Sequence, residues 1–124
     1  MAAQNSSAVD GLSARAISYD TAPTARDDPR REILSLGTLR LGASCTGGDV
    51  EVFATTTRND SYIRSSNEED PHFNVGEEVE VQNANNGTSI VGYDERASND
   101  VVTATLVYDE SIVRCHVAGT AFGN

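Results

Sequence analysis

The chain has 124 residues, enough for one domain with a single hydrophobic core and too few for two. Its formal net charge is −10, and residues 41–124 carry all of it, with four arginines against fourteen acidic residues. Because a strongly acidic surface repels phosphate backbones, we expect no nucleic-acid binding. The sequence has no run of about 18 apolar residues, so we also expect no membrane insertion.

Residues 1–32 differ in composition and charge pattern from the rest of the chain. Their start lacks the basic and apolar regions of a secretory signal, and the stretch after Ile17 combines two prolines with alternating charge. This composition suits an extended arm or linker that orders on a neighbouring surface, and it also suits a disordered leader. We predict an N-terminal arm over residues 1–32, with Leu12 and Ile17 as its assembly contacts.

Part of this stretch resembles a short segment that recurs in phage tail fibres and in large exported actinobacterial proteins. The matching residues are Asn5, Val9–Ala14 and Ile17. In those proteins the segment stands just before a C-terminal β knob. The resemblance implies a junction between a stalk and a knob in an assembly that is often trimeric.

From Ile33 onward, short runs alternate apolar and polar residues with the period of two that is typical of strands with one face inward. Turn sequences such as Thr46–Asp49 and Asn85–Gly87 separate these runs. The runs predict strands near residues 33–41, 50–56, 61–64, 77–83, 89–93, 101–108 and 112–122. Their spacing, without a helical pattern after residue 32, predicts an all-β domain over residues 33–124, an antiparallel β-sandwich or jelly-roll-like module.

The only two cysteines, Cys45 and Cys115, lie near the two ends of this β region. Buried free cysteines are common in cytosolic proteins, whereas a disulfide closing a loop of this length would stabilise the fold by roughly 4 kcal/mol. We predict a Cys45–Cys115 disulfide. The sequence has no CxxC or paired-histidine pattern beside them, so we expect no metal site there.

No residue pattern in the sequence indicates catalysis. Cys115 and His116 are sequence neighbours and therefore point to opposite faces of a strand, and the sequence has no G-x-S-x-G motif for a nucleophile. We predict no catalytic residue and no cofactor.

Several turns are acidic, at residues 59–60, 67–70, 94–95 and 99–100. If they gathered at one rim of a sandwich, their oxygens could hold a hard cation such as Ca²⁺. Their spacing does not follow the calcium-loop pattern, and acidic turns also keep strand edges from pairing with other chains. We favour this second interpretation.

A second resemblance covers residues 33–124. Leu39–Cys45, Ala54–Thr57, Arg114–Cys115 and Gly119–Gly123 resemble uncharacterised C-terminal all-β modules of exported actinobacterial proteins and of phage tail-fibre and virion proteins. The resemblance implies an all-β fold and an extracellular or virion location, and it implies no particular activity.

Two functions remain open on the sequence. The first is a non-enzymatic structural or adhesive subunit that contacts protein partners, as a homo-oligomer or within a larger particle. The alternative is a secreted β-sandwich module that binds a glycan or Ca²⁺. A glycan site usually needs stacking aromatics, and the candidates are Tyr62, Phe73, Tyr93 and Tyr108.

Overall fold

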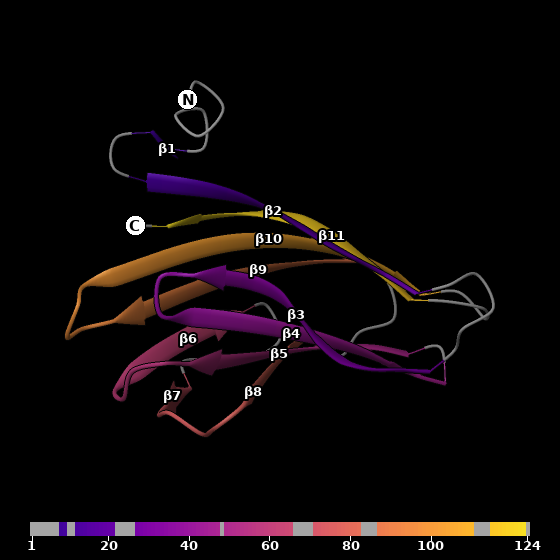
Figure 1. Cartoon of the computed structure of the whole chain (residues 1–124), viewed down its shortest axis with the longest axis horizontal. Coiled ribbons are helices and arrows are strands. Elements are labelled where there is room, and N and C mark those ends of the chain that lie inside the picture. Colours follow the sequence, from indigo (N-terminus) through magenta and orange to yellow (C-terminus); the bar gives the residue numbers. More distant parts are fainter. Residues whose placement is uncertain are drawn as a thin grey trace.

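The computed structural model contains two antiparallel β-sheets (Figure 1). It describes residues 8–9, 12–21, 27–47, 49–65, 71–82, 87–110 and 115–123. The large sheet has seven strands in the order β1-β2-β11-β10-β9-β6-β7, and the small sheet has four in the order β3-β4-β5-β8. The strands are β1 (Ala8–Val9), β2 (Leu12–Asp20), β3 (Asp28–Leu36), β4 (Leu39–Thr46), β5 (Asp49–Thr56), β6 (Ser61–Ser65), β7 (His72–Phe73), β8 (Val79–Gln82), β9 (Gly87–Glu95), β10 (Asp100–Glu110) and β11 (Cys115–Gly123).

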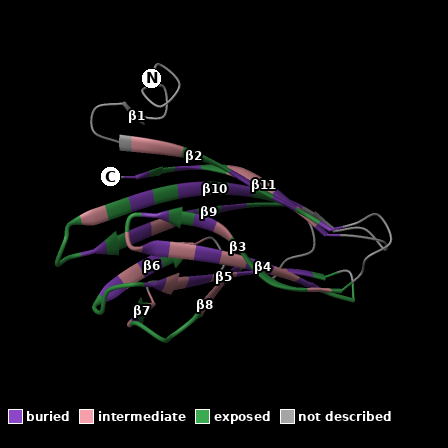
Figure 2. Cartoon of the chain, viewed as in Figure 1, coloured by how far each residue is buried: buried purple, intermediate pink, exposed green. Residues whose placement is uncertain are grey.

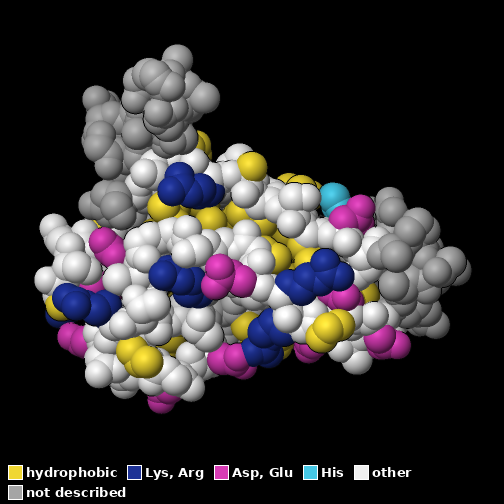
Figure 3. Space-filling model, viewed as in Figure 1, with side chains coloured by type: hydrophobic (Ala, Val, Ile, Leu, Met, Phe, Trp, Pro, Cys, Tyr) yellow, Lys and Arg dark blue, Asp and Glu magenta, His cyan; other side chains and the backbone are white. Residues whose placement is uncertain are grey.

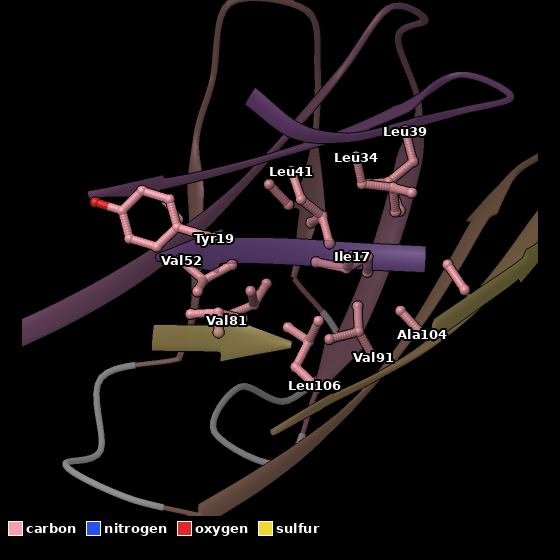
Figure 4. Packing of buried hydrophobic residues seen from close by; sticks show 14 of the residues in the cluster. Ile17, Tyr19, Leu34, Leu39, Leu41, Val52, Val81, Val91, Ala104 and Leu106 are labelled. Atoms are coloured by element: carbon pink, nitrogen blue, oxygen red, sulfur yellow. The ribbon is translucent and has the colours of Figure 1, made fainter. Parts of the chain in front are cut away.

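The two sheets enclose one hydrophobic core. Burial alternates along the strands, as in β5 and β9, so one side of each sheet faces the interior and the other faces solvent (Figure 2). Figure 4 shows Ile17, Leu41 and Leu106, from three strands of the two sheets, directed into the same interior. The predicted all-β class is therefore confirmed.

Consecutive strands lie side by side in each sheet. β3, β4 and β5 form one meander, β9, β10 and β11 form another, and β2 pairs with β11, which joins the two ends of the described chain. This strand order shows two antiparallel sheets, and it does not by itself establish the jelly-roll order expected from the sequence. Short hairpin turns explain the meanders: the turn expected at Thr46–Asp49 joins β4 to β5, with Gly47 at φ 60°.

The single strand expected at residues 33–41 is two strands. Gly37, at φ 58°, turns the chain between β3 and β4, so the dense run of leucines is divided over a hairpin. The turn expected at Asn85–Gly87 lies between β8 and β9, where residues 83–86 are outside the described part of the chain.

The predicted arm over residues 1–32 differs most from the structure. Leu12–Asp20 is strand β2, paired with β11 over eight residue pairs that run from Ser13–Gly123 to Asp20–His116. Ile17 and Tyr19 are 2% and 3% exposed and belong to the core. The domain boundary expected after residue 32 falls inside β3, so β2 and β3 are part of the sandwich. Residues 1–7 are outside the described residues.

The predicted disulfide is confirmed: Cys45 and Cys115 are bonded, with their Cα atoms 6.0 Å apart. Because Cys45 lies in β4 and Cys115 in β11, the bond joins the small sheet to the large one. Next to the disulfide, Thr21 extends the contact between β2 and β11, because its Oγ1 accepts a 2.9 Å hydrogen bond from the Cys115 backbone N–H. The cross-link therefore fixes the end of the sandwich at which β2 leaves the large sheet.

Candidate protein-contact surface

The outer face of the large sheet carries a regular set of uncharged side chains. Four neighbouring strands, β2, β11, β10 and β9, are in register, so their outward residues form three rows across the sheet. We call these twelve residues the contact face. The rows are Ala14, Phe122, Thr103 and Gly92; Ala16, Thr120, Thr105 and Ile90; and Ser18, Ala118, Val107 and Thr88.

All twelve residues of the contact face are exposed or half-buried. Three large apolar side chains stand out on it: Ile90 is 60% exposed, Phe122 52% and Val107 51%. The solvent face of an antiparallel sheet usually carries polar and charged residues. A face without a single charge on a chain of net charge −10 is therefore unusual.

Charged residues border the contact face at both ends. Beyond the third row, Asp20 pairs with His116 in the strand register, and His116 Nδ1 lies 3.6 Å from Asp20 Oδ1. At the first row, Arg64 of β6 is next to Gly92, and Asp94 follows on β9. The uncharged region is thus a bounded patch with a polar rim, as at protein interfaces.

The outer face of the small sheet has the opposite character. Arg30 forms an ion pair with Glu78 and places its guanidinium 4.1 Å from the centre of the Phe53 ring. Together with Glu32 and Arg40 these residues line an open groove of about 280 Å³. Figure 3 shows arginine and acidic side chains side by side over the region of β3, β4 and β5. The two outer faces of the sandwich therefore differ in charge.

A buried polar cluster lies inside the sandwich and holds the two sheets together. The Tyr93 hydroxyl of the large sheet lies 2.8 Å from Thr38 Oγ1, 2.7 Å from Thr56 Oγ1 and 3.2 Å from Ser61 Oγ. Ser61 Oγ in turn donates to the Arg58 carbonyl. Each of these hydroxyls has a protein partner, so the cluster satisfies its own hydrogen bonds. Its role is structural.

Glu95 is a buried carboxylate, 0% exposed, at the end of β9. It accepts hydrogen bonds from the Ser98 hydroxyl and from the backbone N–H groups of Ser98 and Ala97. The Ser98 hydroxyl, more than the Arg58 guanidinium 3.9 Å away, lowers the pKa of Glu95 against the opposing effect of burial. The carboxylate therefore closes the β9–β10 turn in its ionised form.

The other acidic turns have similar local roles. Asp60 Oδ1 lies 2.9 Å from His72 Nε2, and Asp100 Oδ2 accepts a hydrogen bond from the Thr38 backbone N–H. Within the described residues, no group of three or more His, Cys, Asp or Glu side chains is arranged to hold a metal ion. Residues 67–70 of the proposed acidic rim are outside the described part.

The aromatic residues suggested for glycan stacking are mostly in the core. Phe73, Tyr93 and Tyr108 are at most 3% exposed, whereas Tyr62 is half-buried. The Tyr62 ring centre lies 4.9 Å from that of His72 and 5.0 Å from the Arg96 guanidinium. A stacking surface of several aromatic rings is therefore not formed by these four residues.

Of the two proposed assembly contacts, only the Ile17 side chain lies within the described residues. Ile17 points into the core, and the Leu12 side chain lies outside the described residues. The contact face was missed because each strand was interpreted only for its inward residues. The outward residues of 14–18, 88–92, 103–107 and 118–122 are all uncharged in the sequence, which indicates uncharged outward positions in four strands but not that these strands are neighbours.

A scan against models of known protein families, a search of curated proteins and a search of solved structures each returned no match. Within the described residues, no helix is long and apolar enough to cross a membrane.

Proposed function

We propose that this chain is a non-enzymatic structural or adhesive module that works by protein–protein contact, and that it associates with further copies of itself through the contact face. The observation that carries the proposal is the bounded, uncharged patch of twelve side chains on a chain of net charge −10. Exposed apolar surface surrounded by polar residues is typical of sites where proteins bind one another. An assembly of this kind takes the place of the arm-mediated contact expected from the sequence.

Charge favours this face over the charged outer face of the small sheet for self-association. Two copies that carry −10 each repel one another wherever their acidic residues come close. On the contact face there is no charge to desolvate or to oppose, so β-branched, alanine and phenylalanine side chains can be buried directly.

The face is large enough for a specific contact. Strands are about 4.8 Å apart and residues on one face repeat every ~6.8 Å, so the three rows on four strands span about 20 Å by 20 Å. Including β6 and the row that contains Val101, the flat area is roughly 600 Å² per copy, at the lower end for specific interfaces.

The disulfide supports placing the module outside the reducing cytosol, in an extracellular or virion setting. Structural disulfides persist in oxidising compartments, where small β domains with lean cores rely on them. A virion particle or a cell-surface appendage, built from many copies, fits both the disulfide and the self-association that we propose.

The proposal predicts that a charge at the centre of the contact face prevents assembly. Thr105→Asp places a carboxylate between Ile90 and Thr120, where two copies would meet. We expect the native mass of the unaltered protein to rise with concentration and that of Thr105→Asp to remain at the monomer value, as measured by sedimentation velocity.

The matched control is Thr55→Asp, the same change in a strand on the outer face of the small sheet, opposite Arg40. It should assemble like the unaltered protein. If the unaltered protein stays monomeric at millimolar concentration, or if both variants assemble equally well, the proposal is wrong.

A further inference from the structure

A hollow interrupts the contact face at Gly92. Because Gly92 has no side chain, an open groove of about 310 Å³ lies above it, flanked by Tyr62, Arg64, Asp94, Val101 and Thr103. The glycine is not needed for a turn or a close approach. A Cβ built at this position would have only the Arg64 carbonyl at 4.0 Å as its nearest neighbour, and the backbone there is ordinary strand. The empty space is therefore a property of the outer surface.

An exposed aromatic ring lies two strands away from this groove. Phe122 of β11 is in the same row as Gly92, with Thr103 of β10 between them. Its side chain is 52% exposed, although phenylalanine has no polar group that gains from contact with water. An aromatic anchor that enters a pocket is the usual centre of a protein interface.

The register makes the ring and the groove complementary between two copies. Consider two copies packed face to face, with a two-fold axis between them that runs parallel to β10. In each copy β11 lies on one side of β10 and β9 on the other. The rotation therefore places β11 of one copy opposite β9 of the other. Phe122 then lies over Gly92 of the second copy, and Thr120 lies over Ile90. A large side chain meets a small one in both rows, and the same contacts occur twice because the axis is two-fold.

We infer that two copies of this chain pair face to face about an axis along β10, each inserting Phe122 into the Gly92 groove of the other. This inference rests on the proposed function and adds the partner and the geometry. Thr105 and Val107 of β10 lie on the axis and face their own copies. Arg64 of β6 faces Ala14 of β2 at the rim, where the guanidinium keeps its contact with water.

The pairing also separates the charged surfaces. The dimer is a stack of four sheets in which both small sheets are outermost. Packed sheets are about 10 Å apart, so the charged outer faces stand roughly 30 Å from each other. This exceeds the screening length of about 8 Å at physiological ionic strength, so the charges on these two outer faces oppose the pairing only weakly.

The test combines two substitutions on the ring and the groove. Phe122→Ala removes the anchor, and Gly92→Val fills the groove with a side chain that the strand accommodates. We expect each to weaken dimerisation by roughly 30-fold or more in sedimentation equilibrium, the size of a hot-spot loss. The matched control is Val75→Ala, which truncates an apolar side chain of similar exposure, 54%, away from the contact face; it should leave the dimer unchanged.

Cysteine cross-linking tests the axis. Thr105→Cys should be joined to its own copy by a short thiol-reactive linker, because the two residues 105 face each other directly across sheets about 10 Å apart. The same linker should join Thr120→Cys, its register neighbour, much less, because two strand spacings shift the equivalent residues sideways by about 10 Å in addition to the distance between the sheets.

The outcomes separate this inference from the proposed function. Self-association that Thr105→Asp abolishes but that Phe122→Ala and Gly92→Val leave intact would keep the function and overturn the geometry. Cross-linking through Thr120→Cys alone would overturn the axis. A protein that is monomeric at all concentrations would overturn both.

Discussion

Glu95 illustrates how a single residue sets the local structure of this protein. A carboxylate that is 0% exposed is unfavourable unless hydrogen bonds replace its hydration. Ser98 and Ala97 supply these bonds from the turn that follows, and they lower the pKa of Glu95. The residue is therefore part of the β9–β10 hairpin rather than a solvated turn acid.

The lowered pKa predicts a loss of stability in acid. A carboxyl group whose pKa is lower in the folded than in the unfolded protein stabilises the fold above its ordinary value of 4.5, and this stabilisation disappears as the pH falls through the folded pKa. We expect the melting temperature to fall below about pH 4.5, and Glu95→Gln to lower it at pH 7 and reduce its dependence on pH.

Two comparisons make this measurement specific. Glu32→Gln removes a carboxylate from the exposed outer face of the small sheet and should leave the stability at pH 7 unchanged. Part of the acid dependence should remain in Glu95→Gln, because a hydrogen bond from Arg31 also lowers the pKa of Asp28. Equal melting temperatures of Glu95→Gln and the unaltered protein from pH 3 to pH 7 would contradict the role given to Glu95.

The position of Glu95 was predictable in part. Ser89, Val91, Tyr93 and Glu95 alternate along β9, so the strand period places Glu95 on the inward face. What the sequence does not reveal is that Ala97 and Ser98 turn back to donate to it. The chain then enters β10 through Asn99, whose φ is positive, 63°, and an isolated sequence does not determine this turn geometry.

At the scale of elements, β2 was not recognised as a strand. Arg15 has the same strand parity as Ile17 and Tyr19 but is exposed, so it interrupts the apolar alternation in the sequence. β2 forms a strand because it pairs with β11 over eight residue pairs and because Ile17 and Tyr19 pack in the core. Strand formation of this kind depends on tertiary context more than on local propensity. Strands β5, β6, β8, β9 and β10, whose alternation is regular, were all predicted near their observed positions.

The placement of β2 predicts the effect of truncating Ile17. Removing a buried isoleucine side chain down to alanine should lower the free energy of unfolding by about 2–4 kcal/mol, since the residue is 2% exposed between the sheets. Urea denaturation measures this change. The neighbouring Ser18→Ala, on the outward side of the same strand, should change it by less than about 0.5 kcal/mol. If Ile17→Ala also proved neutral, residues 12–20 would be an arm, as their composition suggested.

At the scale of the whole molecule, the outer faces of the two sheets differ in charged side chains. The small sheet carries Arg30, Glu32, Arg40 and Glu78 on its outer side. The large sheet carries the uncharged contact face on its outer side. The sequence shows that the two classes of outward residue exist, but only the pairing of β2 with β11 and of β11 with β10 brings the uncharged ones together. The contact face is thus a property of the topology and was not accessible from the separate strands.

The disulfide between the sheets predicts how the whole molecule resists unfolding. Cys45 and Cys115 are separated by 70 residues, so their bond restricts much of the unfolded chain and should contribute about 4 kcal/mol. Replacing both with alanine avoids leaving a buried thiol and should lower the free energy of unfolding by about that amount, as measured in urea. The unaltered protein in excess reductant should show a similar loss.

The same bond should act on the contact face only through the stability of the fold. Both sulfur atoms are in the core, at the end of the sandwich near Thr21, and neither residue is one of the twelve in the contact face. The double alanine variant should therefore still dimerise under conditions in which it is folded, and Phe122→Ala should weaken that dimer as in the unaltered protein. Loss of dimerisation in a variant whose circular dichroism remains that of the folded protein would show that the cross-link also sets the shape of the large sheet. A loss of stability well below 1 kcal/mol would show that the two sheets are held by the core and the Tyr93 cluster without it.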